Sequence, residues 1–203
     1  MTFTSIAVLP PLPAEALKSI QQARDEMLQE REYEIYLTTY DSHVRLDALV
    51  EILPRLNDRE YWTLLRDVWI SSEVTLPDKD KWLSLLRAKR PERDRLMVPS
   101  DRRFLARLPD VVTIYRGCGH VDGIYGLSWT LDYERARFFA VYACGPRRRV
   151  LSPQYHGTTP TIAKATCPKN DVLSYFSRRN EAEIVVDPTK IHLIDAREWR
   201  SSR

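Results

Sequence analysis

The distribution of glycine is the strongest constraint on how this chain can fold. The sequence has 203 residues and only six glycines, and all six lie between Gly117 and Gly157. Average usage of about 7% would give about fourteen. Glycine supplies positive-φ turns and room for close backbone approach, which sheets and tight loops often need. The chain before Gly117 lacks this residue, so we expect it to be helical and closely connected.

The balance of charge changes near the same place. Residues 1–100 carry 14 Lys and Arg against 17 Asp and Glu, whereas residues 101–203 carry 17 against 11. Hydrophobic residues make up 43% of the chain and charged residues 29%, as in ordinary soluble globular proteins. We predict an α+β fold with a helical region over residues 1–107 and a core over residues 108–203.

Apolar residues at helical spacing predict a series of short helices in the first part. The segments with this pattern begin at Ala14, Asp41, Asp58, Asp78 and Ser100. Trp62, Trp69 and Trp82 fall on these segments, and we expect them in the core rather than on a stacking surface. The basic stretch over residues 79–107 contains interspersed acids, which is typical of solvated helix faces, so a nucleic-acid surface is the less favoured interpretation.

Period-two apolar runs begin near residue 111 and predict strands. Residues 111–115 form a β-branched and aromatic run that stops at Arg116 and Gly117. A helix is expected behind the N-cap Asp132. Later strands are expected over residues 161–166, 182–186 and 191–194, with a short helix over residues 171–176.

Several common classes of site are excluded by the motifs. The glycines from Gly117 to Gly123 have the spacing G-x-G-x-x-x-G, which differs from the dinucleotide fingerprint of a Rossmann domain. No phosphate-binding P-loop and no G-x-S-x-G nucleophile motif occurs. Cys118 and His120 alternate in one loop, but two ligands alone make a poor metal site.

The remaining features favour a cytoplasmic protein without a membrane partner. The three cysteines have no C-x-x-C spacing, so we expect free thiols in a reducing compartment. The N-terminus lacks the basic and apolar segments of a signal peptide. No run of about eighteen apolar residues is present, which excludes a membrane-spanning helix at the level of sequence.

Three short blocks in the second half carry candidate chemistry. They are Tyr115-Arg116-Gly117, Ser128-Trp129-Thr130 and Glu181-Ala182-Glu183. Each block alone has an ordinary interpretation, since a serine can be a turn residue and two glutamates can lie on an exposed strand edge. Alternation along a strand would place both carboxylates on one face.

Taken in order, these blocks resemble the signature of arginine-type mono-ADP-ribosyltransferases. That pattern is an aromatic residue with Arg on a strand, then Ser-x-Ser/Thr, then Glu-x-Glu before an apolar run. The resemblance covers residues 108–195 and departs at Trp129, where the family usually has a small residue. It implies an ADP-ribosyltransferase-like split β-sandwich that binds NAD in a cleft without a Rossmann fingerprint.

The resemblance also implies roles for the residues of the three blocks. Glu183 would stabilise the oxocarbenium-like transition state, Ser128 would hold Glu183, and Glu181 would act on the incoming acceptor. Arg116 would grip the NAD phosphates, which suits its planar fork of donors. The cofactor-binding set would further include Tyr115, Gly117, Ser128, Trp129 and Thr130.

The expected activity is transfer of ADP-ribose from NAD to a macromolecular target, with release of nicotinamide. By resemblance, glutamate rather than glutamine at Glu181 favours an arginine of a target protein as acceptor, in a bacterial or phage effector. Two alternatives remain open. One is a catalytically silent binding protein or inhibitor of the same fold, against which the presence of both glutamates argues. The other is an NAD glycohydrolase that uses water as the acceptor.

Overall fold

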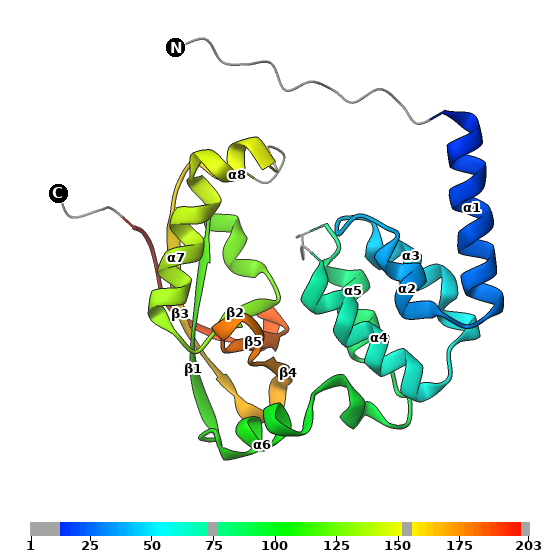
Figure 1. The fold of residues 1–203 in the computed structure, drawn as a ribbon. Helices are drawn as coiled ribbons and strands as arrows, with labels where there is room; N and C mark the ends of the chain where they lie inside the picture. Colours follow the sequence, from blue (N-terminus) through cyan, green and yellow to red (C-terminus); the bar gives the residue numbers. More distant parts are fainter. Residues whose placement is uncertain (1–12, 73–76, 152–155, 200–203) are drawn as a thin grey trace, which may run out of the picture.

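The computed structural model describes residues 13–72, 77–151 and 156–199. It is an α+β structure in which helices dominate the first half and an antiparallel sheet the second (Figure 1). The division of the chain into two domains at residue 107 stays a prediction. The helices of the first half end at Arg107 and the first strand begins at Val111, so the stretch before Gly117, which is expected to be helical, also contains most of β1.

The helices of the first half are short and follow one another closely. They are α1 (Ala14–Gln29), α2 (Tyr33–Thr38), α3 (Arg45–Ile52), α4 (Asp58–Ser71), α5 (Lys79–Leu86) and α6 (Pro99–Arg107). The helix expected from Ser100 begins one residue earlier, at Pro99, and Val98 rather than Ser100 is its N-cap. The helix expected from Asp41 begins at Arg45, and the carbonyl of Asp41 accepts from the Arg45 amide at 3.0 Å.

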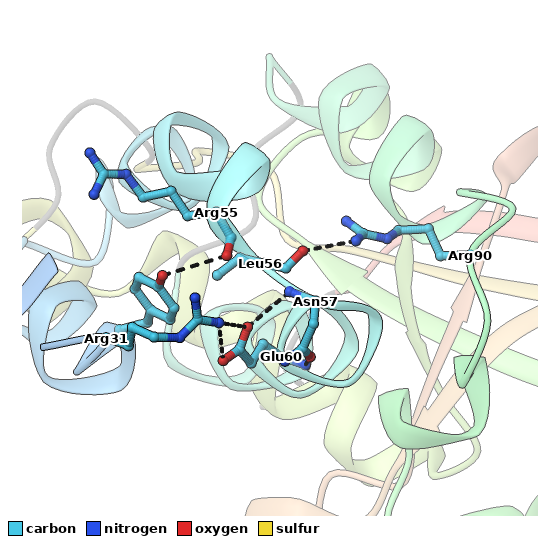
Figure 2. A network of polar contacts seen from close by, with 7 residues as sticks. Arg31, Arg55, Leu56, Asn57, Glu60 and Arg90 are labelled. Atoms are coloured by element: carbon cyan, nitrogen blue, oxygen red, sulfur yellow. Dashed lines mark hydrogen bonds and ion pairs between the residues drawn. The ribbon is translucent and has the colours of Figure 1, made fainter. Parts of the chain in front are cut away.

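The N-terminus of α4 is held by a polar network (Figure 2). Asn57 and Glu60 form a capping box, in which each side chain accepts from the other residue's backbone amide at 2.8 Å. Arg31 donates to both Glu60 oxygens at 2.8 Å, and Arg90 donates to the Leu56 carbonyl at 3.0 Å. Such caps stabilise a helix by about 1 kcal/mol each. The network fixes the start of the helix that carries Trp62 and Trp69.

One antiparallel sheet with the strand order β4-β5-β2-β1-β3-β6 forms the core of the second half. Its strands are β1 (Val111–Cys118), β2 (Ser128–Thr130), β3 (Thr161–Pro168), β4 (Val172–Phe176), β5 (Glu183–Val186) and β6 (His192–Glu198). The helices α7 (Tyr133–Cys144) and α8 (Pro146–Leu151) follow β2. Asp132 caps α7 as expected, since its side chain accepts from the Glu134 and Arg135 amides.

The helix expected over residues 171–176 is a strand. A 3-10 turn, Lys169–Asp171, precedes this strand. From Val172 onward the chain pairs with β5, with Tyr175 opposite Ile184 and Phe176 opposite Glu183. A short apolar run fits either period, and here the pairing partner decides.

Two different helical elements pack on the sheet. Buried side chains of α2 to α5 share a hydrophobic cluster with Leu127, Phe176 and Val185, so the helical region packs against β4 and β5. The small residues Ala136 and Ala140 of α7 pack on Ile162 and Tyr115, beside β1 and β3 (Figure 1). The backbones approach closely, because a Cβ at Gly117 would lie 1.7 Å from the Ala136 carbonyl oxygen. Only glycine fits there.

Candidate active site

Ser128 and Glu183 form the polar pair at the centre of the sheet. They lie on the adjacent antiparallel strands β2 and β5, where Thr130 is directly opposite Glu183 and Ser128 opposite Val185. The Ser128 hydroxyl donates a hydrogen bond to Oε1 of Glu183. The structure therefore brings together the serine and the glutamate that the sequence motifs singled out.

A third member of this cluster comes from the helical region. The indole N–H of Trp69, on α4, donates to Oε2 of Glu183 at 3.2 Å. Trp69 is 2% exposed. The expectation that Trp69 lies in the core is confirmed, but the sequence does not predict its contact with the glutamate. No sequence pattern links residues 114 positions apart, so only the packing of α4 on the sheet reveals it.

The pair lies on a face of the sheet that two helical elements cover. Tyr115, Thr130 and Glu183 form one row across β1, β2 and β5, and residues directly opposite each other project to the same side. On this side, α7 covers Tyr115. The helical region covers Phe176 and Val185. Glu183 and its serine partner therefore lie between the two covering elements.

Arg116 projects to the opposite side of β1 from Tyr115, because side chains alternate along a strand. Its Nε donates to the Gly123 carbonyl at 2.6 Å and its Nη1 donates to the Ser128 carbonyl. Burial lowers the pKa of the guanidinium below its usual value. A Cβ at Gly126 would lie 2.1 Å from its Nη2, so glycine makes room for it. These contacts give Arg116 a role in shaping the loop before β2, and phosphate binding stays a prediction.

Glu181 is not part of the strand that contains Glu183. It follows the 3-10 turn Arg178–Asn180 and has helical dihedral angles, and Ala182 then has a φ of 44°. The expected alternation of two carboxylates along one strand is therefore wrong, since β5 begins only at Glu183. The bend is held at the Glu181 carbonyl, which accepts from Thr130 Oγ1 at 2.6 Å.

Trp129 is accommodated by the alternation of β2. It is 2% exposed and packs in the cluster with Ile114 and Ile184. Its indole N–H donates to the Gly126 carbonyl at 3.0 Å. Trp129 thus points into the core, on the opposite side of the sheet from Glu183, and its large side chain does not fill the candidate site.

Tyr115 borders a small cavity on the α7 side. Its ring packs edge to face on Tyr133, with centroids 5.6 Å apart. The cavity is also lined by Ile162, Lys164, Asp195, Arg197 and Trp199. Tyr115 is therefore half-buried at the α7 end of the row that leads to Glu183, while Gly117 is covered by α7.

The cysteines do not form a nucleophilic centre. Burial raises the pKa of the Cys118 and Cys144 thiols, and that of Cys167 to about 11. A thiolate, rather than a thiol, is the reactive species. All three side chains are free in the structure. The chemistry of the site therefore rests on oxygen and nitrogen groups.

Within residues 13–72, 77–151 and 156–199, no three His, Cys, Asp or Glu side chains gather as metal ligands would. Across those same ranges, none of the helices has both the length and the apolar character needed to span a bilayer. Comparisons with protein-family models, with curated proteins and with solved structures gave no match.

Proposed function

We propose that the protein is an NAD-dependent mono-ADP-ribosyltransferase that modifies an arginine of a target protein and releases nicotinamide. The observation that carries the proposal is the Ser128–Glu183 pair. A serine at the start of one strand holds a glutamate at the start of its neighbour, on a face flanked by helices. The same residues form the second and third blocks of the signature.

The chemistry follows from the charge that develops as the glycosidic bond of NAD breaks. The ribose becomes oxocarbenium-like, so a fixed carboxylate near it stabilises the transition state more than the ground state. Ser128 and Trp69 donate to separate oxygens of Glu183. Each carboxylate oxygen has a second lone pair. In the proposed mechanism the ribose 2-hydroxyl also donates to Glu183, and this hydrogen bond strengthens as charge develops.

We assign the acceptor side of the site to Glu181. It lies beside β2, and its backbone is held by Thr130 at the sharp bend before β5. A carboxylate on such a turn can orient an incoming guanidinium without occupying the NAD side. Glu181→Gln should therefore suppress transfer to protein more than it suppresses NAD hydrolysis, and equal loss of both activities would move Glu181 to the NAD site.

The split β-sandwich is part of the same proposal. The strands β4, β5 and β2 would form one small sheet and β1, β3 and β6 the other, joined at the β1–β2 ladder. Ile114 of the second group and Ile184 of the first lie in one hydrophobic cluster, so the two groups of strands share a core. NAD would bind over Tyr115, Thr130 and Glu183, between α7 and the helical region.

Incubation of the purified protein with labelled NAD and a cell lysate tests the proposal. Transfer predicts label on macromolecules that protease removes and nuclease does not. Free labelled ADP-ribose without modified protein would instead identify a glycohydrolase. Intact NAD at the end of the incubation would contradict both activities and leave a silent binding protein of this fold.

A further inference from the structure

We propose that Trp69 is a positioning residue for Glu183, so that the helical region contributes directly to catalysis. This inference rests on the proposed function, and it assigns a part of the site to a segment outside the three motif blocks. Its basis is the hydrogen bond from the Trp69 indole to Oε2 of Glu183 at 3.2 Å.

The chemistry of a buried indole explains why this contact is specific. Tryptophan has a single polar group, the N–H, which can only donate. A buried indole N–H usually has a partner, because a buried donor without one keeps the full cost of its lost hydration. Here the partner is the carboxylate of Glu183, whose hydrogen bonds are stronger than neutral ones when it is ionised. The contact therefore favours one orientation of the carboxylate.

The surroundings of Trp69 keep the donor fixed. Its ring packs edge to face on Trp82, with centroids 4.9 Å apart, and at 6.4 Å on Phe176. The helix that carries it is capped at Asn57. At the other end of this helix Arg45 donates to the Ser71 carbonyl at 3.1 Å. The indole is thus held from several sides and is a rigid support for the carboxylate.

Ser128 and Trp69 have complementary effects on the carboxylate. The terminal torsion of a glutamate side chain has a broad energy minimum, so one hydrogen bond does not fix the plane of the carboxylate. Ser128 on β2 contacts Oε1 and Trp69 on α4 contacts Oε2. One donor comes from the sheet and the other from the helical region. Together they fix the plane of the carboxylate to which the ribose hydroxyl would donate.

A matched pair of variants on one helix tests the proposal. Trp69→Phe keeps an aromatic ring and removes the donor to Glu183. Trp62→Phe is the control, because Trp62 is also fully buried on α4 but donates to the Pro91 carbonyl at 2.7 Å. Both variants lose one indole hydrogen bond, so their losses of stability should be similar.

The kinetic effects of the two variants should differ. Loss of a hydrogen bond that orients a charged catalytic group should lower kcat by roughly 10-fold to 100-fold with little change in KM, because the interaction matters most in the transition state. Trp62→Phe should leave kcat within about twofold of the wild type, since general packing losses at a distance are not specific to the transition state.

A second readout does not depend on turnover. The chain has five tryptophans, and Trp69→Phe identifies the indole N–H signal of Trp69 in a nitrogen–proton NMR spectrum. If the contact exists, Glu183→Gln should shift that signal strongly and leave the Trp62 signal in place. An unshifted Trp69 signal would overturn the inference while leaving the proposed function intact.

The two readouts separate the two claims. A shifted signal together with wild-type kcat in Trp69→Phe would show a contact without a positioning role and would overturn the inference. A wild-type protein that consumes no NAD, with a shifted signal, would overturn the proposed function and the catalytic purpose of the contact with it. Loss of kcat in Trp69→Phe, a shifted signal and an active Trp62→Phe support both.

Discussion

The helical region of the first half and α7 of the second half pack on the same face of the sheet, but they are held there by different contacts. The helical half contains no glycine and uses long side chains, so that Arg45, Arg90 and Trp62 donate to backbone carbonyls of neighbouring segments. The sheet half uses backbone contact, and Gly117 lets α7 lie directly against β1. α7 is therefore fixed to the sheet by close main-chain packing, whereas the helical region adds side-chain hydrogen bonds to its hydrophobic contact with β4 and β5.

Side-chain hydrogen bonds and an ion pair also join the helical half to the sheet half. Arg87 at the end of α5 pairs with Asp187 after β5, and Arg93 donates to the Leu173 carbonyl at 3.2 Å. Ser177 after β4 donates to Asp101 of α6 at 2.7 Å. One side-chain hydrogen bond of this kind contributes about 1 kcal/mol, which is less than the cost of forcing two closely packed backbones apart. We expect mutations in the two covers to differ accordingly.

The largest effect on stability is expected at Gly117. Gly117→Ala would place a Cβ 1.7 Å from the Ala136 carbonyl oxygen, so α7 has to move away from β1. Such overpacking costs about 3 kcal/mol or more when backbone has to shift. Gly145→Ala is the control, because the neighbours of its Cβ would be no closer than 3.4 Å. Denaturant unfolding of both variants measures the difference, and equal stabilities would show that α7 is not fixed by this contact.

A smaller loss is expected at Arg116. Arg116→Lys keeps the charge but loses the fork that bonds the carbonyls of Gly123 and Ser128, which costs about 1–3 kcal/mol for charge-assisted hydrogen bonds. Thermal melting without NAD should show this loss. Calorimetric titration with NAD then separates the two roles. Reduced NAD affinity with unchanged melting would assign Arg116 to the phosphates and contradict the scaffold role.

The smallest effect is expected at the ion pair between the halves. Burial raises the pKa of Asp187, but hydrogen bonds from Thr189 and Arg87 outweigh it, and the net shift is downward. A lowered folded pKa adds stability above the unfolded value near pH 4, and this stability is lost as the pH falls through the folded pKa. Because Arg87 is half exposed, we expect about 1 kcal/mol or less.

Asp187→Asn tests this sign. The variant should be slightly less stable than the wild type at pH 7, and the gap should narrow as the pH falls from the unfolded-state pKa near 4 through the lowered folded-state pKa. Urea unfolding at pH 7 and over this acid range measures it. A gap that stays constant with pH would mean that the ion pair does not help to join the helical region to the sheet.

The sequence predicts the regular parts of the fold well because their patterns are local. The glycine-free half is helical, and the helix expected from Asp58 begins at that residue. The run from residue 111 is a strand. The helix expected over residues 171–176 is wrong: Asn170 favours a helical cap locally, but pairing with β5, a contact distant along the chain, makes Val172–Phe176 a strand.

The site shows the same division between local and distant information. The motif blocks identified Ser128 and Glu183, and strand pairing brings them together. The left-handed backbone at Ala182 removes Glu181 from the strand, and nothing in the residue type of alanine signals it. Trp69 contacts Glu183 only through tertiary packing, so this contact is visible in the structure and not in the sequence.

The central claim is that the Glu183 carboxylate stabilises the transition state of NAD cleavage. The most direct measurement is the NAD turnover of Glu183→Gln beside that of the wild type, with calorimetric NAD binding and a thermal melt on the same samples. Glutamine keeps the size of the side chain and removes its charge. We predict a kcat lower by about 10²–10³-fold, as for loss of one preorganised electrostatic group, with NAD affinity and melting temperature close to those of the wild type. Unchanged turnover in this folded, NAD-binding variant would contradict the account.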